Sequence, residues 1–150
     1  MFTDWALASL HHIAVFTLAA TLAAELAILT IDIEGKMIGR LARIDTAYGI
    51  SAAIVVIVGV ARVVYGAKGY DYYIANHIFW TKMALFVIVG LLSIPPTLRY
   101  LAWNRQLRAN ATFRPEASEI RRMRAYLRAE AAFFLAIPVA AAAMARGYGI

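Results

Sequence analysis

The chain contains no cysteine. Disulfides, thiolate metal sites and thiol catalysis are therefore excluded, although the absence does not identify a redox compartment. Histidine is also scarce, with three residues, and there is no HExxH pattern, no glycine-rich phosphate loop and no recognisable Ser-His-Asp order. The sequence thus gives no support to the common hydrolase or nucleotide-binding classes, and no catalytic residue can be assigned from it.

Long polar segments are also missing. The most extended one runs from about Asn104 to Arg128 and is too short for a soluble domain. Hydrophobic residues make up 63% of the chain, whereas soluble domains average roughly 45–50%. The N-terminus has no basic region, and its apolar run is too long for a signal peptide. We therefore expect residues 1–150 to form a single integral membrane domain.

Four apolar stretches account for most of the chain. They run over Trp5–Ile31, Ala47–Ala67, Tyr73–Leu98 and Ala129–Ala145. A helix needs about 20 apolar residues to cross the hydrocarbon core. The last stretch reaches that length if the arginines before it snorkel to the interface. The pattern predicts an all-α fold, an integral membrane four-helix bundle with up-down-up-down threading.

Basic residues are unevenly distributed between the connecting segments. Eleven of the 15 Lys and Arg residues lie between the first and second stretches or between the third and fourth. Because cytoplasmic loops carry such an excess, we expect both termini to be periplasmic and the protein to be a multi-pass protein of the bacterial cytoplasmic (inner) membrane. The net charge of +6 indicates the lipid bilayer, with its anionic headgroups, as a partner, and not nucleic acid.

Two local sequence patterns add detail to the predicted four-helix bundle. The first connector, Asp32–Asp45, has apolar residues at three-residue steps, which is typical of a short helix lying on the membrane surface. In the third stretch, Pro95–Pro96 should bend the helix or end its regular part. The hydroxyl group of Ser93 or Thr97 is expected to satisfy the backbone groups freed there.

Ionisable residues within or beside the apolar stretches are candidates for function, because charges at membrane depth cost about 2.5–3.5 kcal/mol each and usually face a bundle interior. We expect them to form a polar column inside the bundle. Glu25 should have a cationic or hydrogen-bonding partner, Arg99 or Arg43, in a structural ion pair or a proton relay. Glu130 is expected to pair with its flanking arginines. The set consists of His11, Glu25, Arg62, Lys82 and Glu130.

The outer part of this column has the residue types of a haem site. Imidazole is a common metal and haem ligand, and His11 lies on the polar side of its stretch, so it is the candidate metal ligand. Lys82 would balance a haem propionate or supply the other axial contact. Interfacial roles remain open for both residues, since histidine suits the headgroup region and lysine snorkels. The candidate haem b-binding residues are His11, His12, Arg62, Tyr65, Trp80 and Lys82.

Three segments resemble an uncharacterised family of bacterial four-helix membrane proteins, known only as a domain of unknown function. The resemblance covers nearly the whole chain and implies the four-helix membrane fold, but no activity. The segments are LARIDTAYGISA (Leu41–Ala52), RVVYGAKGYDYYIANHIFWTKMALFVIVGLLSIPPT (Arg62–Thr97) and MARGYG (Met144–Gly149).

More distantly, the chain is similar to HemJ-type protoporphyrinogen oxidases and to the CopD membrane domain. HemJ-type proteins have a histidine early in the first span and a lysine early in the third. ASLH ending at His11 and FWTK ending at Lys82 stand in those positions. The resemblance implies haem binding. The chain departs from the family over Thr17–Glu25, where Trp-x-Ala-Gly and Pro-Arg are absent, and it lacks the C-terminal motif with Asn and Glu before Pro.

The sequence therefore leaves three functions open. The first is a haem-binding redox protein of the inner membrane, which would be a membrane oxidoreductase if it is an enzyme. The second is a non-enzymatic accessory subunit in a larger membrane complex or a homo-oligomer. The third is a small transporter that moves a metal ion or an anion along the polar column.

Overall fold

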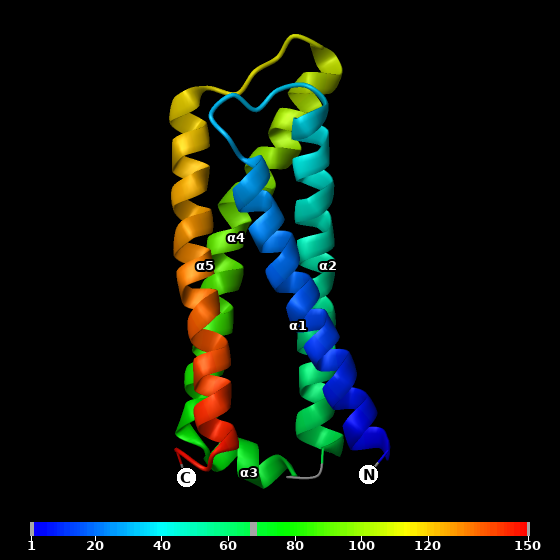
Figure 1. Ribbon diagram of the computed structural model, residues 1–150, viewed down its shortest axis with the longest axis vertical. Helices are drawn as coiled ribbons and strands as arrows, with labels where there is room; N and C mark the ends of the chain where they lie inside the picture. Colours follow the sequence, from blue (N-terminus) through cyan, green and yellow to red (C-terminus); the bar gives the residue numbers. More distant parts are fainter. Residues whose placement is uncertain (1, 67–68, 150) are drawn as a thin grey trace.

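The computed structural model describes residues 2–66 and 69–149. Within these residues the chain forms five α-helices and no β-strand, which confirms the all-α class (Figure 1). Ala67, the expected end of the second apolar stretch, lies outside the described residues. The helices are α1 (Phe2–Ile28), α2 (Lys36–Tyr65), α3 (Tyr70–Ala75), α4 (His77–Ala109) and α5 (Ala117–Ala145).

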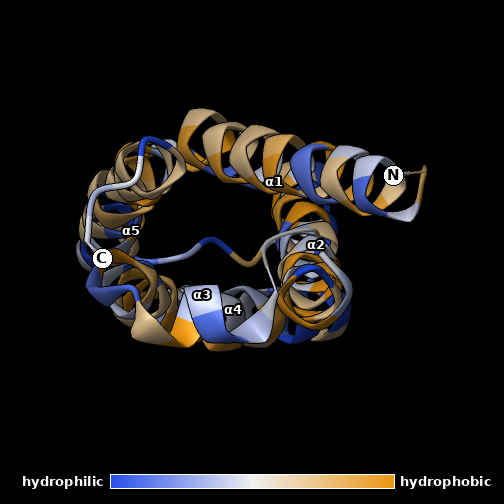
Figure 2. Cartoon of the chain, turned by 90° about the horizontal axis from the view of Figure 1, so that it is seen from below, coloured by the Kyte–Doolittle hydropathy of each residue, from blue (hydrophilic) through white to orange (hydrophobic). Residues whose placement is uncertain are grey.

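Four of these helices have the length and composition of membrane spans. Helices α1, α2, α4 and α5 contain 27, 30, 33 and 29 residues, and each is apolar enough to cross a membrane. Hydrophobic residues predominate along all four (Figure 2). Large apolar side chains such as Val60, Leu91 and Val139 are exposed on their outer surfaces. Such surface is rare on soluble proteins, so the structure agrees with the expected four-span membrane protein.

The long helices form two pairs. Helix α1 packs along α2, the first helix pair, and α4 packs along α5, the second helix pair. Fewer contacts join α2 to α4 and α1 to α5, and the backbones of α1 and α4 do not approach each other in the described residues. We call the end with the α1–α2 and α4–α5 connectors the loop end, and the end with both termini and α3 the terminal end (Figure 1).

The first connector differs from the sequence expectation. The prediction of a separate surface helix within residues 32–45 is wrong, because α2 begins at Lys36 and continues without a break to Tyr65. Ile38 and Leu41, which suggested the surface helix, are fully buried. They belong to the hydrophobic core at the loop end. Their three-residue spacing therefore marks the inner face of a longer helix.

The two prolines of α4 lie inside the helix. Helix α4 does not end at Pro95 and Pro96 but continues past both. The expected repair of the freed carbonyl groups is not found where it was placed. The Ser93 hydroxyl donates to the carbonyl of Gly90 at 2.8 Å, and the Thr97 hydroxyl donates to Oδ1 of Asp45 at 2.7 Å. Thr97 thus joins the two helix pairs.

Glu119 of α5 fastens the second helix pair at the loop end. Its Oε1 lies 2.8 Å from Nη1 of Arg99, and its Oε2 accepts a hydrogen bond of 2.9 Å from Nε1 of Trp103. A further ion pair, between Arg114 and Glu34, links the two connectors. These contacts close the loop end around a packed core.

Asn76 organises the terminal end. Its Oδ1 accepts hydrogen bonds from the backbone N–H groups of Ile78 and Phe79, so the side chain caps the N-terminus of α4. Its Nδ2 donates to the carbonyl of Tyr148 at 3.0 Å, and the backbone N–H of the following residue donates to the carbonyl of Gly149 at 2.9 Å. The C-terminal segment is thereby held against the start of α4.

The orientation of the two ends in the membrane is open to a direct test. We expect Tyr148→Cys at the terminal end to react with an impermeant thiol reagent added to intact spheroplasts, because the positive-inside rule places that end in the periplasm. Ala111→Cys in the α4–α5 connector should react only after the membrane is opened. The chain has no native cysteine to confuse the readout. The reverse labelling pattern would show an inverted topology.

Candidate functional site

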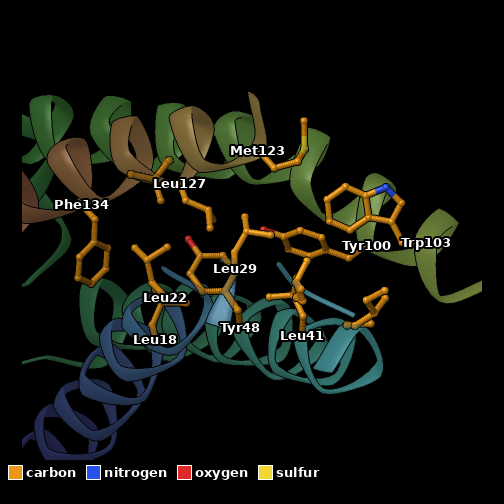
Figure 3. Close-up of a cluster of buried hydrophobic side chains, with 14 of the residues drawn as sticks. Leu18, Leu22, Leu29, Leu41, Tyr48, Tyr100, Trp103, Met123, Leu127 and Phe134 are labelled. Atoms are coloured by element: carbon orange, nitrogen blue, oxygen red, sulfur yellow. The ribbon is translucent and has the colours of Figure 1, made fainter. Parts of the chain in front are cut away.

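Three carboxyl side chains are buried in the half of the bundle nearer the loop end. Glu25 of α1, Asp45 of α2 and Glu130 of α5 are 2%, 5% and 1% exposed. Tyr48 of α2 and Tyr100 of α4 lie close enough to interact electrostatically with all three carboxyl groups. We call these five residues the carboxyl cluster. Both tyrosines reach into the core between the helix pairs (Figure 3).

Several polar atoms of the carboxyl cluster are buried without a hydrogen-bond partner. Oδ1 of Asp45 accepts the hydrogen bond from Thr97, and the hydroxyl of Tyr48 lies within hydrogen-bonding reach of the Glu130 carboxyl group. In contrast, Oε1 of Glu25 and the hydroxyl of Tyr100 are buried without a partner among the described residues. Unsatisfied buried polar groups are rare in folded proteins, and each calls for a structural or functional reason.

The expected cationic partner of Glu25 is not found. Arg99 pairs with Glu119, and Arg43 is exposed. Glu130 does not pair with its flanking arginines either. In the part of the chain that the structure describes, no ion pair involves a member of the carboxyl cluster. The predicted cationic partners are therefore wrong, since Arg99 reaches Glu119 instead and the arginines that flank Glu130 form no ion pair with it among the described residues.

Buried apolar side chains lie on both sides of Tyr48 and Tyr100, the two tyrosines of the carboxyl cluster, along the bundle (Figure 3). An apolar layer therefore interrupts the expected polar column and divides its residues into an acidic group and a cationic group. On α2 the buried face changes from polar Ser51 to Val55 and Val58 before it reaches Arg62. The layer on the side of the loop end contains Leu29, Leu41, Trp103, Ile120 and Met123, and the layer on the side of the terminal end contains Leu18, Leu22, Val55, Val89 and Phe134.

A second group of polar residues, His11, Arg62 and Lys82, lies nearer the terminal end, and we call it the cationic cluster. The imidazole of His11 lies over Gly59, where an added Cβ would be 3.5 Å from its Cε1. Arg62 and Lys82 are near enough for their charges to act on His11. Nζ of Lys82 lies 5.6 Å from the ring centroid of Phe79. Nδ1 of His11 and Nε of Arg62 are buried without a described partner.

The other expected haem-binding residues lie on the surface. His12 is exposed, and its ring centroid is 6.4 Å from that of His11. Tyr65 is 72% exposed and Trp80 56% exposed. The indole of Trp80 donates to the carbonyl of Ile74 at 3.0 Å. The structure thus brings together His11, Arg62 and Lys82, but it does not gather His12, Tyr65 and Trp80 around them.

Two pockets of about 300 Å³ each open at the loop end. Neither is lined by a residue of the carboxyl cluster or the cationic cluster. Among the described residues, no three His, Asp or Glu side chains are arranged to hold a metal ion. One pocket is lined by Arg40, Arg43, Ile44 and Ala47, and the other by Ile31, Ile120, Arg121, Arg124 and Arg128.

None of Asp45, Tyr48 and Tyr100 was assigned to a site from the sequence. The spacing of Asp45, Tyr48 and Ser51 was the available signal. Residues three apart share a helix face, and these three are buried on α2. The involvement of Tyr100 could not be read from spacing, because it depends on how α4 packs against α2.

A family model described as a predicted membrane protein, DUF2214, matches residues 3–149. The chain belongs to the DUF2214 family. This confirms the resemblance to a four-helix membrane family of unknown function. No curated protein and no solved structure matches the chain. The more distant likeness of this DUF2214 protein to HemJ-type oxidases and CopD therefore rests on the short motifs that end at His11 and Lys82.

Proposed function

We propose that this protein binds haem b at the cationic cluster and serves as a redox protein of the bacterial inner membrane, with His11 as the axial ligand. The observation that carries the proposal is the state of His11. Its Nδ1 is buried and has no hydrogen-bond partner among the described residues. A histidine nitrogen in that state is either an unsatisfied polar atom or a free ligand position.

The charges around His11 suit the same ligand. Arg62 and Lys82 lie near it, and no carboxylate of the described chain forms an ion pair with either residue. Haem carries two propionates, and guanidinium and ammonium groups are their usual partners. Nε of Arg62 is buried without a hydrogen-bond partner among the described residues, so its N–H group could donate to a propionate. The two cations would thus hold and neutralise the propionates.

The surface of α2 beside His11 carries no bulky group, because Gly59 presents no side chain to the imidazole. A bound haem would supply a one-electron redox centre. The contribution of the chain would be to bind it, balance its charge and shield it with the surrounding apolar helices.

Haem binding is tested by producing the full chain with ample haem and purifying it in mild detergent. The wild-type protein is expected to show a Soret band. His11→Ala should lower haem occupancy at least tenfold, which corresponds to a loss of about 1.4 kcal/mol or more in binding free energy. Lys82→Met should have a smaller effect if Lys82 would balance a propionate charge, and an effect equal to that of His11→Ala if Lys82 would itself be needed to hold the haem.

His77→Ala is the matched control, since His77 is exposed at the start of α4 and should not affect haem content. A wild-type protein without Soret absorbance overturns the proposal, as does equal haem loss in His77→Ala and His11→Ala. In either case the accessory-subunit function becomes the leading alternative, and it is tested by co-purification of a membrane complex after mild solubilisation.

A further inference from the structure

The carboxyl cluster needs positive charge or protons. Glu25, Asp45 and Glu130 are each at least nine-tenths buried. They are close enough to influence one another electrostatically. Moving an isolated carboxylate out of water costs so much free energy that the group keeps its proton unless a cation pairs with it. Several neighbouring carboxylates add mutual repulsion to that cost.

The described side chains supply no such cation. The titratable groups that face the carboxyl cluster are Glu25 from α1, Asp45 and Tyr48 from α2, Tyr100 from α4 and Glu130 from α5. The hydroxyl of Thr97 donates to Asp45. Within the described residues, Arg99 is paired with Glu119. All of the polar groups that line the cluster are therefore acids or hydroxyls.

The carboxyl cluster lies across the boundary between the helix pairs. Glu25, Asp45 and Tyr48 belong to the first helix pair, and Tyr100 and Glu130 belong to the second. Glu130 of the second pair interacts with Tyr48 of the first, and the unpartnered hydroxyl of Tyr100 lies within electrostatic reach of Glu25 and Asp45 of the first pair. The charge of the cluster must consequently affect how tightly the two pairs associate.

We propose that the carboxyl cluster is a proton-binding site, in which protons held between the two helix pairs keep them together and are exchanged when the pairs part. The ligand is a proton and not a metal ion, because no three described acidic side chains are arranged around a common metal position. The apolar layers on both sides keep water out while the pairs are closed.

Proton exchange follows from linkage. When the helix pairs part, the carboxyl groups reach water and release protons, so the closed form binds more protons than the open form. A higher pH therefore favours the open form, and a lower pH favours the closed form. Because the proposal does not depend on haem, the experiment uses the full chain without haem, reconstituted in lipid.

The first measurement is infrared spectroscopy at neutral pH. Protonated carboxyl groups absorb separately from carboxylates, and the wild-type protein is expected to show this band. Glu130→Gln removes one of three such groups and should reduce the band by roughly a third if each carboxyl holds one proton. Glu25→Gln should do the same, which keeps the test valid if one variant fails to fold. Glu116→Gln, at an exposed position beside α5, is the control and should leave the band unchanged.

The second measurement is the distance between spin labels on Ile31→Cys and Ala111→Cys, one in each connector, over a range of pH. The distance should lengthen at alkaline pH in the wild-type background and lengthen less with Glu130→Gln, which leaves only two of the three carboxyl groups to ionise. The proposal is overturned if the wild-type protein lacks the infrared band of protonated carboxyl groups, or if neither Gln variant reduces that band. It is also overturned if the distance between the spin labels does not change with pH. Loss of the band on adding Na⁺ or Mg²⁺ at constant pH would also overturn it, since the site would then bind a cation.

Discussion

Replacing Trp103 with alanine is expected to lower the free energy of unfolding by about 3–5 kcal/mol, the range for deleting a large aromatic side chain from a packed core. Trp103 is fully buried, and its ring centroid lies 5.7 Å from that of Tyr100. The variant also removes the hydrogen bond to Oε2 of Glu119. The measurement is equilibrium unfolding of the purified protein in detergent.

Leu101→Ala is the matched control, because Leu101 lies on the same stretch of α4 but is 46% exposed. It should change the free energy of unfolding by no more than about 0.5 kcal/mol. Trp103→Phe should have an intermediate effect, since it keeps one aromatic ring in the core but loses the hydrogen bond, at about 1 kcal/mol, and the volume of the second ring. If Trp103→Ala and Leu101→Ala destabilise equally, the packing of α4 against α5 at the loop end is not as described.

The membrane fold could be predicted because length and composition determine it. Four apolar stretches long enough to cross a bilayer require helices, since lipid offers no partner to a free backbone group. Helix ends were less predictable. Ile38 and Leu41 have a spacing that suits a surface helix as well as the inner face of a span, and only the packing against the core distinguishes the two. Pro95 and Pro96 were expected to bend α4 or end its regular part, and the helix continues past both.

Individual site residues were more predictable than their partners. Glu25 and Glu130 could be singled out because a carboxyl group within an apolar stretch is unusual. The sequence favoured an arginine partner for Glu25, yet Arg99 is held by Glu119. Which acid an arginine reaches is decided by the distance between helices, and spacing along one chain does not contain that distance. The same reason explains why the role of Tyr100 was missed.

The separation of the two clusters limits what the protein can do. An ion that moves along the bundle axis would have to cross the layer that includes Leu18, Val55 and Phe134, all of them buried. Such a layer has no group to replace the water around an ion, so crossing it would carry the cost of a bare charge in hydrocarbon. The arrangement therefore favours two separate sites, one cationic and one acidic, over a single conducting path.

Asn76→Ala is expected to lower the free energy of unfolding by about 2–4 kcal/mol. Loss of the N-cap of α4 contributes about 1 kcal/mol, and the carbonyl of Tyr148, left without its donor, contributes about 1–3 kcal/mol. Asn76 is fully buried, so water cannot easily replace either hydrogen bond. The measurements are equilibrium unfolding in detergent and the rate of proteolysis of the C-terminal segment, which should rise because that segment is no longer held.

Asn110→Ala provides the control, since Asn110 is an exposed asparagine at the other end of α4 whose side chain accepts only local hydrogen bonds from Thr112. It should cost less than about 1 kcal/mol. Asn76→Ser keeps an oxygen for the cap but has no donor in the place of Nδ2, so its effect should lie between those of Asn76→Ala and the wild type. If Asn76→Ser matches the wild type in both measurements, the bond to Tyr148 does not hold the C-terminal segment, and the cap alone explains the role of Asn76.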